Sequence, residues 1–183
     1  MKIAIIGNGP ISYYQKKIIE QYDLVVRFNG MKNWKEPQKK TIVAIRQHES
    51  GFFGLDKSCN HFTNTNINKM VLIGTNRIGH MKKLCINKNI ETETIHVYND
   101  KYFYPNLNKN YMNKFKNDSF SSGFIIINYF LHKYANANIH IFGMNWNLPK
   151  GYHHMRFERK EIDELSKKYK IKIYKTPSQS YLP

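Results

Sequence analysis

The chain has 183 residues, a formal net charge of +16 at pH 7 and a hydrophobic content of 41%. This length suits one domain, residues 1–183, and the sequence lacks the run of about eighteen apolar residues that could cross a bilayer. Its two cysteines, Cys59 and Cys85, are not spaced for a zinc site, and the N-terminal run looks like a strand rather than a signal peptide, so we expect a cytoplasmic protein.

The strand and helix signals alternate along the chain. The run KIAIIG is continuous and apolar, as is typical of a strand buried on both faces, and Gly7, Gly9 and Pro10 end it before a helix that reaches about Tyr22. Further elements are predicted as strands at 23–30, 41–45, 69–74, 94–98, 138–144 and 171–174, helices at 77–87, 121–135 and 158–169, and loops or short helices at 46–68 and 99–120.

This alternation predicts a single doubly wound α/β domain with a mostly parallel sheet and helices on both faces. In such sheets, ligands bind beyond the carboxyl ends of the strands, where the strand order reverses. The positions of interest are therefore the residues that directly follow strands, namely Gly7 to Pro10, Asn29, Gly74 to Asn76 and Gly143 to Trp146.

The turn IIGNGP places small residues between a strand and a helix, where backbone N–H groups can approach a phosphate. A dinucleotide-binding turn would need a third glycine where Ser12 stands. It would also need an acidic residue at the end of the second strand, which instead ends in Arg27-Phe28-Asn29. The turn therefore favours a nucleotide other than NAD or FAD, and a purely structural turn remains the alternative.

Two other segments carry polar groups at predicted helix starts. In the stretch beginning Ser121-Ser122-Gly123, a serine N-cap would explain the sequence by itself, and a phosphate or ribose contact is the functional alternative. The stretch YHHMRFE contains His153, His154 and Glu158, which a zinc ion could use only if the turn brought them together. We expect no metal there, and surface histidines are the plain alternative.

The net basic charge would attract polyanions such as nucleic acid, anionic lipid headgroups or phosphorylated substrates. The lysines are scattered, and the best candidate patch for nucleic acid, residues 106–117, lacks arginine and any recognised nucleic-acid motif. We therefore disfavour nucleic acid as a partner, and keep a basic face resting on an anionic membrane as an alternative.

Three blocks, in order, resemble the sialyl motifs of the animal-type sialyltransferases, glycosyltransferase family 29. IAIIGNGPISYYQKKIIEQYDLVVRFNG, continued by KKTIVAIRQHE, resembles the large motif, and SSGFIIINYFLHKYANANIHIFGM resembles the small motif. The very short motif, HxxxxE, is matched from His153 to Glu158. Bacterial sialyltransferases of a second family share a similar GNGP start and a Ser-Gly-helix-strand block, and would imply the same chemistry.

The resemblance implies a compact, Rossmann-like, GT-A-variant enzyme. It would transfer sialic acid from CMP-sialic acid to a glycan or glycolipid hydroxyl with inversion, and would need no metal or other cofactor. His153 would be the base for the acceptor hydroxyl, and Glu158 would orient and support its motif. The other carried-over residues would bind the donor: Gly7, Asn8, Gly9 and Asn29 at the phosphate and ribose, Ser121, Ser122 and Gly123 along the nucleotide, Gly143 beside the cytidine, and His154 at the phosphate or in solvent.

The chain also departs from the animal enzymes. We expect no counterpart of their membrane anchor, stem or motif-joining disulfide, and Ile3 stands near the place of the first motif's cysteine, which suits a cytoplasmic protein that is at most peripheral at a membrane. The His/Tyr-rich third motif is contracted to NWNLPKGY, between Met144 and His153. Two alternatives therefore stay open: a transferase for another CMP-activated keto-sugar, or a nucleotide- or glycan-binding module with reduced catalysis.

Overall fold

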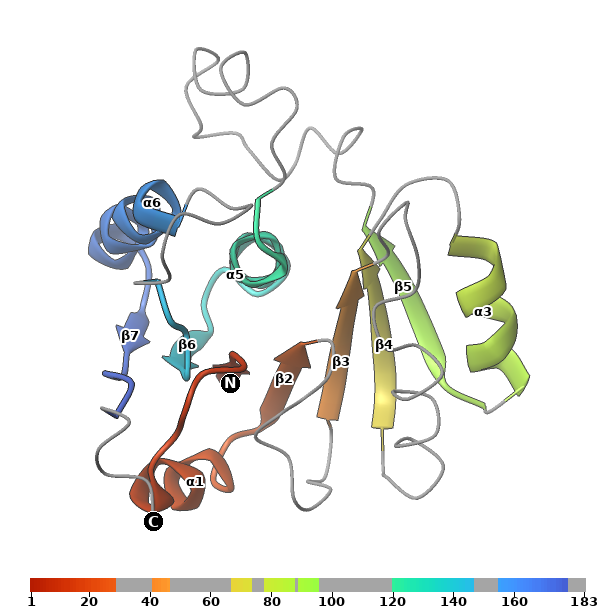
Figure 1. Ribbon diagram of the computed structural model, residues 1–183, viewed down its shortest axis with the longest axis horizontal. Coiled ribbons are helices and arrows are strands. Elements are labelled where there is room, and N and C mark those ends of the chain that lie inside the picture. Colours follow the sequence, from red (N-terminus) through yellow and green to blue (C-terminus); the bar gives the residue numbers. More distant parts are fainter. Residues whose placement is uncertain are drawn as a thin grey trace.

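The computed structural model describes residues 1–28, 41–46, 67–73, 78–87, 89–95, 120–146 and 155–177, and the structural statements below concern these residues. Their strands form one seven-stranded sheet in which every neighbouring pair is parallel (Figure 1). The strands are β1 (Lys2–Ile6), β2 (Leu24–Phe28), β3 (Thr41–Arg46), β4 (Ile67–Ile73), β5 (Glu91–Ile95), β6 (Asn138–Phe142) and β7 (Ile171–Ile173), and the helices are α1 (Tyr13–Ile19), α3 (Ile78–Asn87), α5 (Ser122–Lys133) and α6 (Met155–Lys168).

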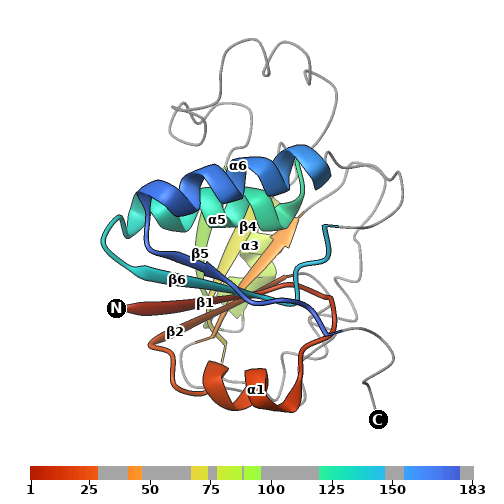
Figure 2. The same ribbon diagram turned by 90° about the vertical axis from the view of Figure 1, so that its left-hand side faces the viewer.

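The predicted doubly wound α/β fold with a parallel sheet is confirmed. Helices α5 and α6 lie side by side over one face of the sheet and α1 lies under the other, as Figure 2 shows. The residues of β1 alternate between the two faces: Ile3 and Ile5 join the apolar cluster under α5, while Ala4 and Ile6 join the cluster over α1. This two-sided burial explains why the first strand is apolar without interruption.

The strand order places a switch point beside β1. The order is β5-β4-β3-β2-β1-β6-β7, so the chain builds outward from β1 in one direction and then returns to add β6 on its other side. Ile6 is paired with Phe142 at the carboxyl end of this central pair of strands. The residues that follow these two strands therefore meet at the edge where doubly wound sheets bind their ligands.

The predicted strand at 94–98 begins too late, because β5 starts at Glu91, and residues 96–98 lie outside the described part of the chain. The sequence pattern did not indicate a strand over the whole of ETETI, because glutamate is uncommon in strands. In the structure, the Nζ atom of Lys69, on the neighbouring strand, contacts the carboxylates of Glu91 and Glu93, the latter at 2.9 Å. Partial burial raises the pKa of Glu93, but hydrogen bonds from Lys133, Tyr129 and Lys69 outweigh this effect and lower the pKa to about 2. A polar edge strand is thus stabilised by pairs that the local sequence does not reveal.

The last predicted helix also differs, since α6 begins at Met155 rather than at residue 158. This places Glu158 in the first turn of the helix instead of at its boundary. None of the helices in the described segments is both long enough and apolar enough to cross a membrane.

His140 lies on β6 in an aromatic cluster on the α1 face of the sheet. Its Nδ1 atom shares a hydrogen bond with the Tyr22 hydroxyl, and its ring centroid is 5.3 Å from that of Tyr22 and 5.8 Å from that of Tyr174. Partial burial lowers the pKa of His140, and the positive charges of Lys172 and Lys2 lower it further. The folded protein therefore favours the neutral imidazole.

We expect this histidine to make the unfolding free energy fall as the pH drops. Because its folded pKa lies below the unfolded value of about 6.5, its contribution is present above that value and is lost as the pH falls through the folded pKa. Between about pH 7.5 and about pH 5.5, the unfolding free energy measured in urea should fall more for the wild type than for His140→Asn. The difference between the two proteins should be less than about 1 kcal/mol, because the ring is only partly buried. An identical pH dependence of the unfolding free energy in the two proteins would show that His140 does not contribute to it.

Candidate functional site

The turn after β1 is fastened to the end of β6. The Gly7 N–H donates to the Phe142 carbonyl oxygen and the Gly9 N–H to the Gly143 carbonyl oxygen, each at 2.8 Å. A Cβ atom on Gly7 would lie 2.4 Å from the Gly143 oxygen, and one on Gly9 would lie 2.7 Å from it. Gly143 itself has a φ of +58°, which disfavours a side chain. Close packing of two turns therefore accounts for these three glycines, and Asn8 lies exposed between two of them.

Met144 joins this pair of turns to the start of α5. Its Sδ atom lies 2.7 Å from the position of a Cβ on Gly7, and its Cε atom 2.3 Å from that of a Cβ on Gly123. The methionine side chain therefore occupies the space between the first glycine turn and the Ser-Ser-Gly segment. The sequence pattern placed Met144 in a segment of interest but gave it no role, because a methionine after a strand carries no chemical signal of its own.

The start of α5 is held by a buried carboxylate from α6. Ser121 is the N-cap of α5, and its Oγ atom accepts a hydrogen bond of 3.1 Å from the Phe124 N–H. The Glu158 carboxylate accepts two hydrogen bonds of 2.6 Å, one from the Ser121 N–H and one from the Ser121 hydroxyl. Glu158 is 0% exposed. These contacts commit the hydroxyl proton of Ser121 to Glu158, and Ser122 is the more exposed of the two serines.

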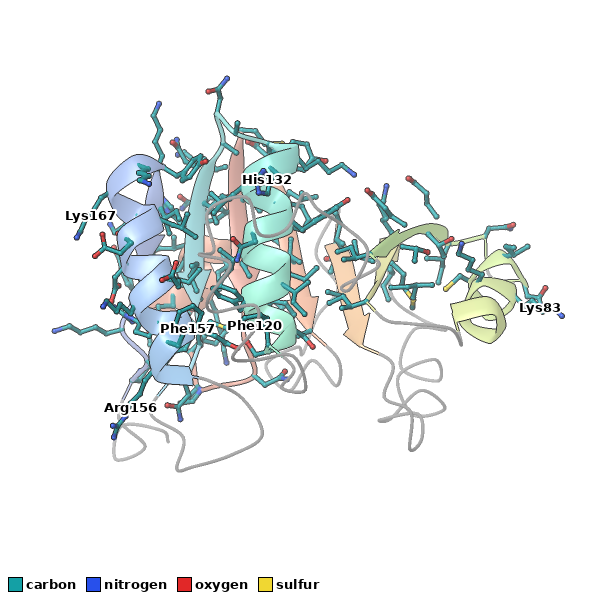
Figure 3. The ribbon with its side chains drawn as sticks, turned by 90° about the horizontal axis from the view of Figure 1, so that it is seen from above. Lys83, Phe120, His132, Arg156, Phe157 and Lys167 are labelled. Atoms are coloured by element: carbon teal, nitrogen blue, oxygen red, sulfur yellow. The ribbon has the colours of Figure 1, made fainter. Side chains whose placement is uncertain are left out.

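Aromatic rings hold the starts of the two helices against each other. The Phe120 ring lies 5.1 Å from that of Phe124 and 6.1 Å from that of Phe157, centroid to centroid. Figure 3, which labels Phe157 on α6 and Phe120 before α5, shows them side by side. The Arg159 guanidinium also lies 4.9 Å from the centroid of the Trp146 ring, so α6 contacts the segment that follows β6.

The segment after β7 returns to the same edge of the sheet. The Thr176 hydroxyl donates a hydrogen bond of 3.1 Å to the Met144 carbonyl oxygen, and the Gln15 side-chain amide donates one of 2.9 Å to the Lys175 carbonyl oxygen. Gln15 also forms a capping box with Ser12 at the start of α1. Ser12 therefore caps a helix at the position where a dinucleotide-binding turn would have glycine. The contacts of Thr176 and Gln15 join residues far apart in the chain, and the sequence pattern gave no signal for them.

Arg27 is a buried cation near this edge. It is 5% exposed and in register with Ile6, the last residue of β1. Burial lowers its pKa to about 10, so the guanidinium stays charged at neutral pH. A buried positive charge thus lies close to the residues that precede the Gly7 turn.

The structure therefore brings together Gly7, Gly9, Gly143, Gly123, Ser121 and Glu158, with Asn8 and Ser122 on the segments that these residues fix. Three of the predicted site residues, Asn29, His153 and His154, lie outside the described residues, as does the segment 74–76, and their roles stay predictions. Within the described segments, the His, Cys, Asp and Glu side chains form no group of three or more that could hold a metal ion.

No family model matches this chain, and no curated protein matches its sequence. Among solved structures, it is similar to the sialyltransferase CstII from Campylobacter jejuni in complex with the substrate analogue CMP-3FNeuAc, with a TM-score of 0.55, 19% identity, and coverage of 95% of this chain and 79% of that one. The complex of CstII with cytidine-5'-monophosphate gives a TM-score of 0.52 and 18% identity, covering 97% of this chain and 80% of that one. At these identities the similarity shows that this chain has a sialyltransferase-like fold, and membership of family 29 stays a prediction.

Proposed function

We propose that this protein is a glycosyltransferase that moves sialic acid from CMP-sialic acid to a hydroxyl of a glycan or glycolipid, with inversion and without a metal. The observation that carries the proposal is the buried contact between Glu158 and Ser121, next to the Gly7–Gly9 turn. It joins the block that resembles the very short motif to the block that resembles the small motif. The similar fold of CstII, which holds CMP or a CMP-sugar analogue in the two solved complexes, supports a CMP-sugar donor.

The donor would lie at the carboxyl edge of β1 and β6. Asn8 is exposed in the first turn, and the N–H groups in the first turn of α5, at Ser122 and Gly123, are of the kind that bind phosphate oxygens. The negative charge that grows on the departing CMP phosphate needs hydrogen-bond donors that are already in place. Glu158 holds these donors in place from the buried side of α5, because its carboxylate accepts hydrogen bonds from Ser121. In our proposal Glu158 is thus a positioning residue, and it does not contact the sugar.

His153 would be the base of the reaction. It precedes Met155, the first residue of α6, by only two residues in the sequence, which supports its assignment to this edge. The imidazole takes the proton of the acceptor hydroxyl as its oxygen bonds to the anomeric carbon, and the bond from that carbon to the phosphate oxygen breaks, so that CMP leaves with the electron pair. Imidazole, whose ordinary pKa in peptides is about 6.5, is a side chain suited to proton transfer at neutral pH.

We expect His153→Ala to lower the rate of CMP release from CMP-sialic acid about 100-fold or more, because a positioned general base contributes at least this much. The measurement is steady-state CMP release with a glycan acceptor, in the presence of a metal chelator, and with the product anomer assigned by NMR. His132→Ala, which replaces an exposed histidine near the end of α5, is the matched control and should keep the wild-type rate.

His154→Ala tests the proposed phosphate contact of His154, since loss of that contact raises the KM for the donor.

Equal rates in the wild type and His153→Ala would remove His153 from this role. Thermal unfolding with CMP, UMP, GMP and ADP tests the donor separately, because a ligand that binds the folded state raises its stability. Stabilisation by CMP without turnover of CMP-sialic acid would reject that donor in favour of another CMP-activated keto-sugar or of a binding module. Turnover that the chelator abolishes would contradict metal independence.

A further inference from the structure

The end of α6, the strand β7 and the segment after it carry an unusual concentration of lysine. The nine residues 167–175, KKYKIKIYK, contain five lysines and no acidic residue. All five are exposed, and we call them the β7 lysine edge: Lys167, Lys168, Lys170, Lys172 and Lys175. Among the described residues, only Lys167 has a carboxylate partner, Glu164 at 2.7 Å on the same helix. The remaining positive charges face outward.

The β7 lysine edge lies at one side of the described sheet. Ile171 and Ile173 pack against the core under α5 and α6, so the intervening Lys172 points to the opposite face. Its Nζ atom lies 4.8 Å from the centroid of the Tyr174 ring, which stacks on Phe142 at 4.3 Å. Lysines are therefore combined here with a partly exposed tyrosine that directly follows an edge strand. Tyrosine and lysine are the residues that proteins place where a bilayer meets water.

Two structural explanations could account for single lysines in this group. A lysine on an edge strand blocks pairing with another sheet, and Lys167 and Lys168 suit the negative end of the α6 dipole. Each explanation needs one or two lysines, whereas the run continues from the helix through the strand and beyond it. A cluster of this size is typical of segments that bind anionic lipid headgroups.

We propose that the β7 lysine edge docks this protein on an anionic bilayer surface. The lysines carry point charges on flexible stems, which suit a fluid layer of headgroups, and the edge lacks the arginines that bind nucleic-acid phosphates in fixed bidentate pairs. This inference does not depend on the proposed donor, because it concerns charges along the β7 edge of the sheet and not the glycine turns.

The test measures how the full-length protein sediments with vesicles at low salt. Vesicles of phosphatidylcholine with about one-third phosphatidylglycerol should bind the wild type, and vesicles of phosphatidylcholine alone should not. Each lysine contributes a factor of about five, so Lys170→Gln/Lys172→Gln should weaken partitioning about 25-fold. The matched control is Lys82→Gln/Lys83→Gln, two exposed lysines on α3, which packs against β5 at the far edge of the sheet. It removes the same charge and should weaken partitioning less than about threefold.

Three results would overturn the proposal. The first is failure of the wild type to bind the anionic vesicles, and the second is an equal loss of binding in both double variants, which would make net charge the cause. The third is displacement of the vesicles by a labelled single-stranded oligonucleotide that binds through the same lysines, which would assign the edge to nucleic acid. CMP-dependent thermal stabilisation of the two variants should equal that of the wild type, so that a failure of membrane docking is distinguishable from a failure of donor binding.

Discussion

Replacing Glu158 by alanine is expected to lower the unfolding free energy by about 2–6 kcal/mol, a large part of the roughly 5–15 kcal/mol that holds a typical domain folded. The carboxylate is fully buried and accepts hydrogen bonds from both the N–H and the hydroxyl of Ser121. Alanine would leave two buried donors without an acceptor, and each such group costs about 1–3 kcal/mol. Glu158→Gln should cost less, because the amide oxygen still accepts one of the two bonds.

Urea unfolding of Glu158→Ala, Ser121→Ala and the double variant measures this contact directly. Ser121→Ala removes the N-cap oxygen and should cost about 1–2 kcal/mol, and the two changes should be non-additive by about 1–2 kcal/mol. Glu164→Ala is the control on the same helix, and it should leave the stability nearly unchanged because that carboxylate is exposed. A small effect of Glu158→Ala, or simple additivity with Ser121→Ala, would show that the contact does not hold the start of α5.

Alanine at Gly7 should be far more disruptive than alanine at Gly123, although both substitutions add one methyl group beside Met144. At Gly7 the nearest atom is the backbone oxygen of Gly143, at 2.4 Å, and it is fixed by the hydrogen bond from Gly9. Two turns must separate to admit the methyl group, at a cost of roughly 3 kcal/mol, and the affinity for CMP should fall at least about tenfold. At Gly123 the nearest atom is the terminal methyl of a flexible methionine, so the cost should stay near 1 kcal/mol.

Combining each substitution with Met144→Ala shows whether the Met144 side chain or the Gly143 backbone oxygen limits the space at each glycine. Removing the methionine tip should make Gly123→Ala about 1 kcal/mol less costly than it is in the wild type. Gly7→Ala should stay costly in the same background, because the Gly143 oxygen remains in place. Unfolding by urea and titration with CMP give the two readouts. Rescue of Gly7→Ala by Met144→Ala would mean that the methionine, and not the backbone, limits the space at the first turn.

The sequence was sufficient for the layout of the sheet and insufficient for the contacts that build the site. The apolar run of β1 and the alternation of elements come from periodicity, which is local, and they predicted the parallel fold correctly. The start of β5 was misplaced because Glu91 and Glu93 look unfavourable until Lys69 and Lys133 are placed beside them. Partners of this kind lie on other elements, and no local pattern reports them.

The same reasoning applies to the candidate site. The resemblance suggested that Glu158 supports its own motif, but it gave no sign of the contact with Ser121, which lies 37 residues away in the chain. The glycines looked like a phosphate-binding turn, and the structure adds that they also let two turns pack closely. Met144 and Thr176 carry no signal in the sequence, because a packing methionine and a hydroxyl bonded to a backbone oxygen are defined by their neighbours.

The place of β1 in the sheet also has a consequence for how the protein is made. Of the described strands, β1 is synthesised before the others, but its second neighbour, β6, begins only at Asn138, so Ile3 has no partner on that side until Ile139 has been added. Until then this largely buried, apolar strand has one unpaired side, which is the state in which nascent chains associate with one another. A messenger RNA truncated before the codon for Asn138 should therefore yield an insoluble product. Synthesis of the longer chain should benefit from a chaperone that shields β1.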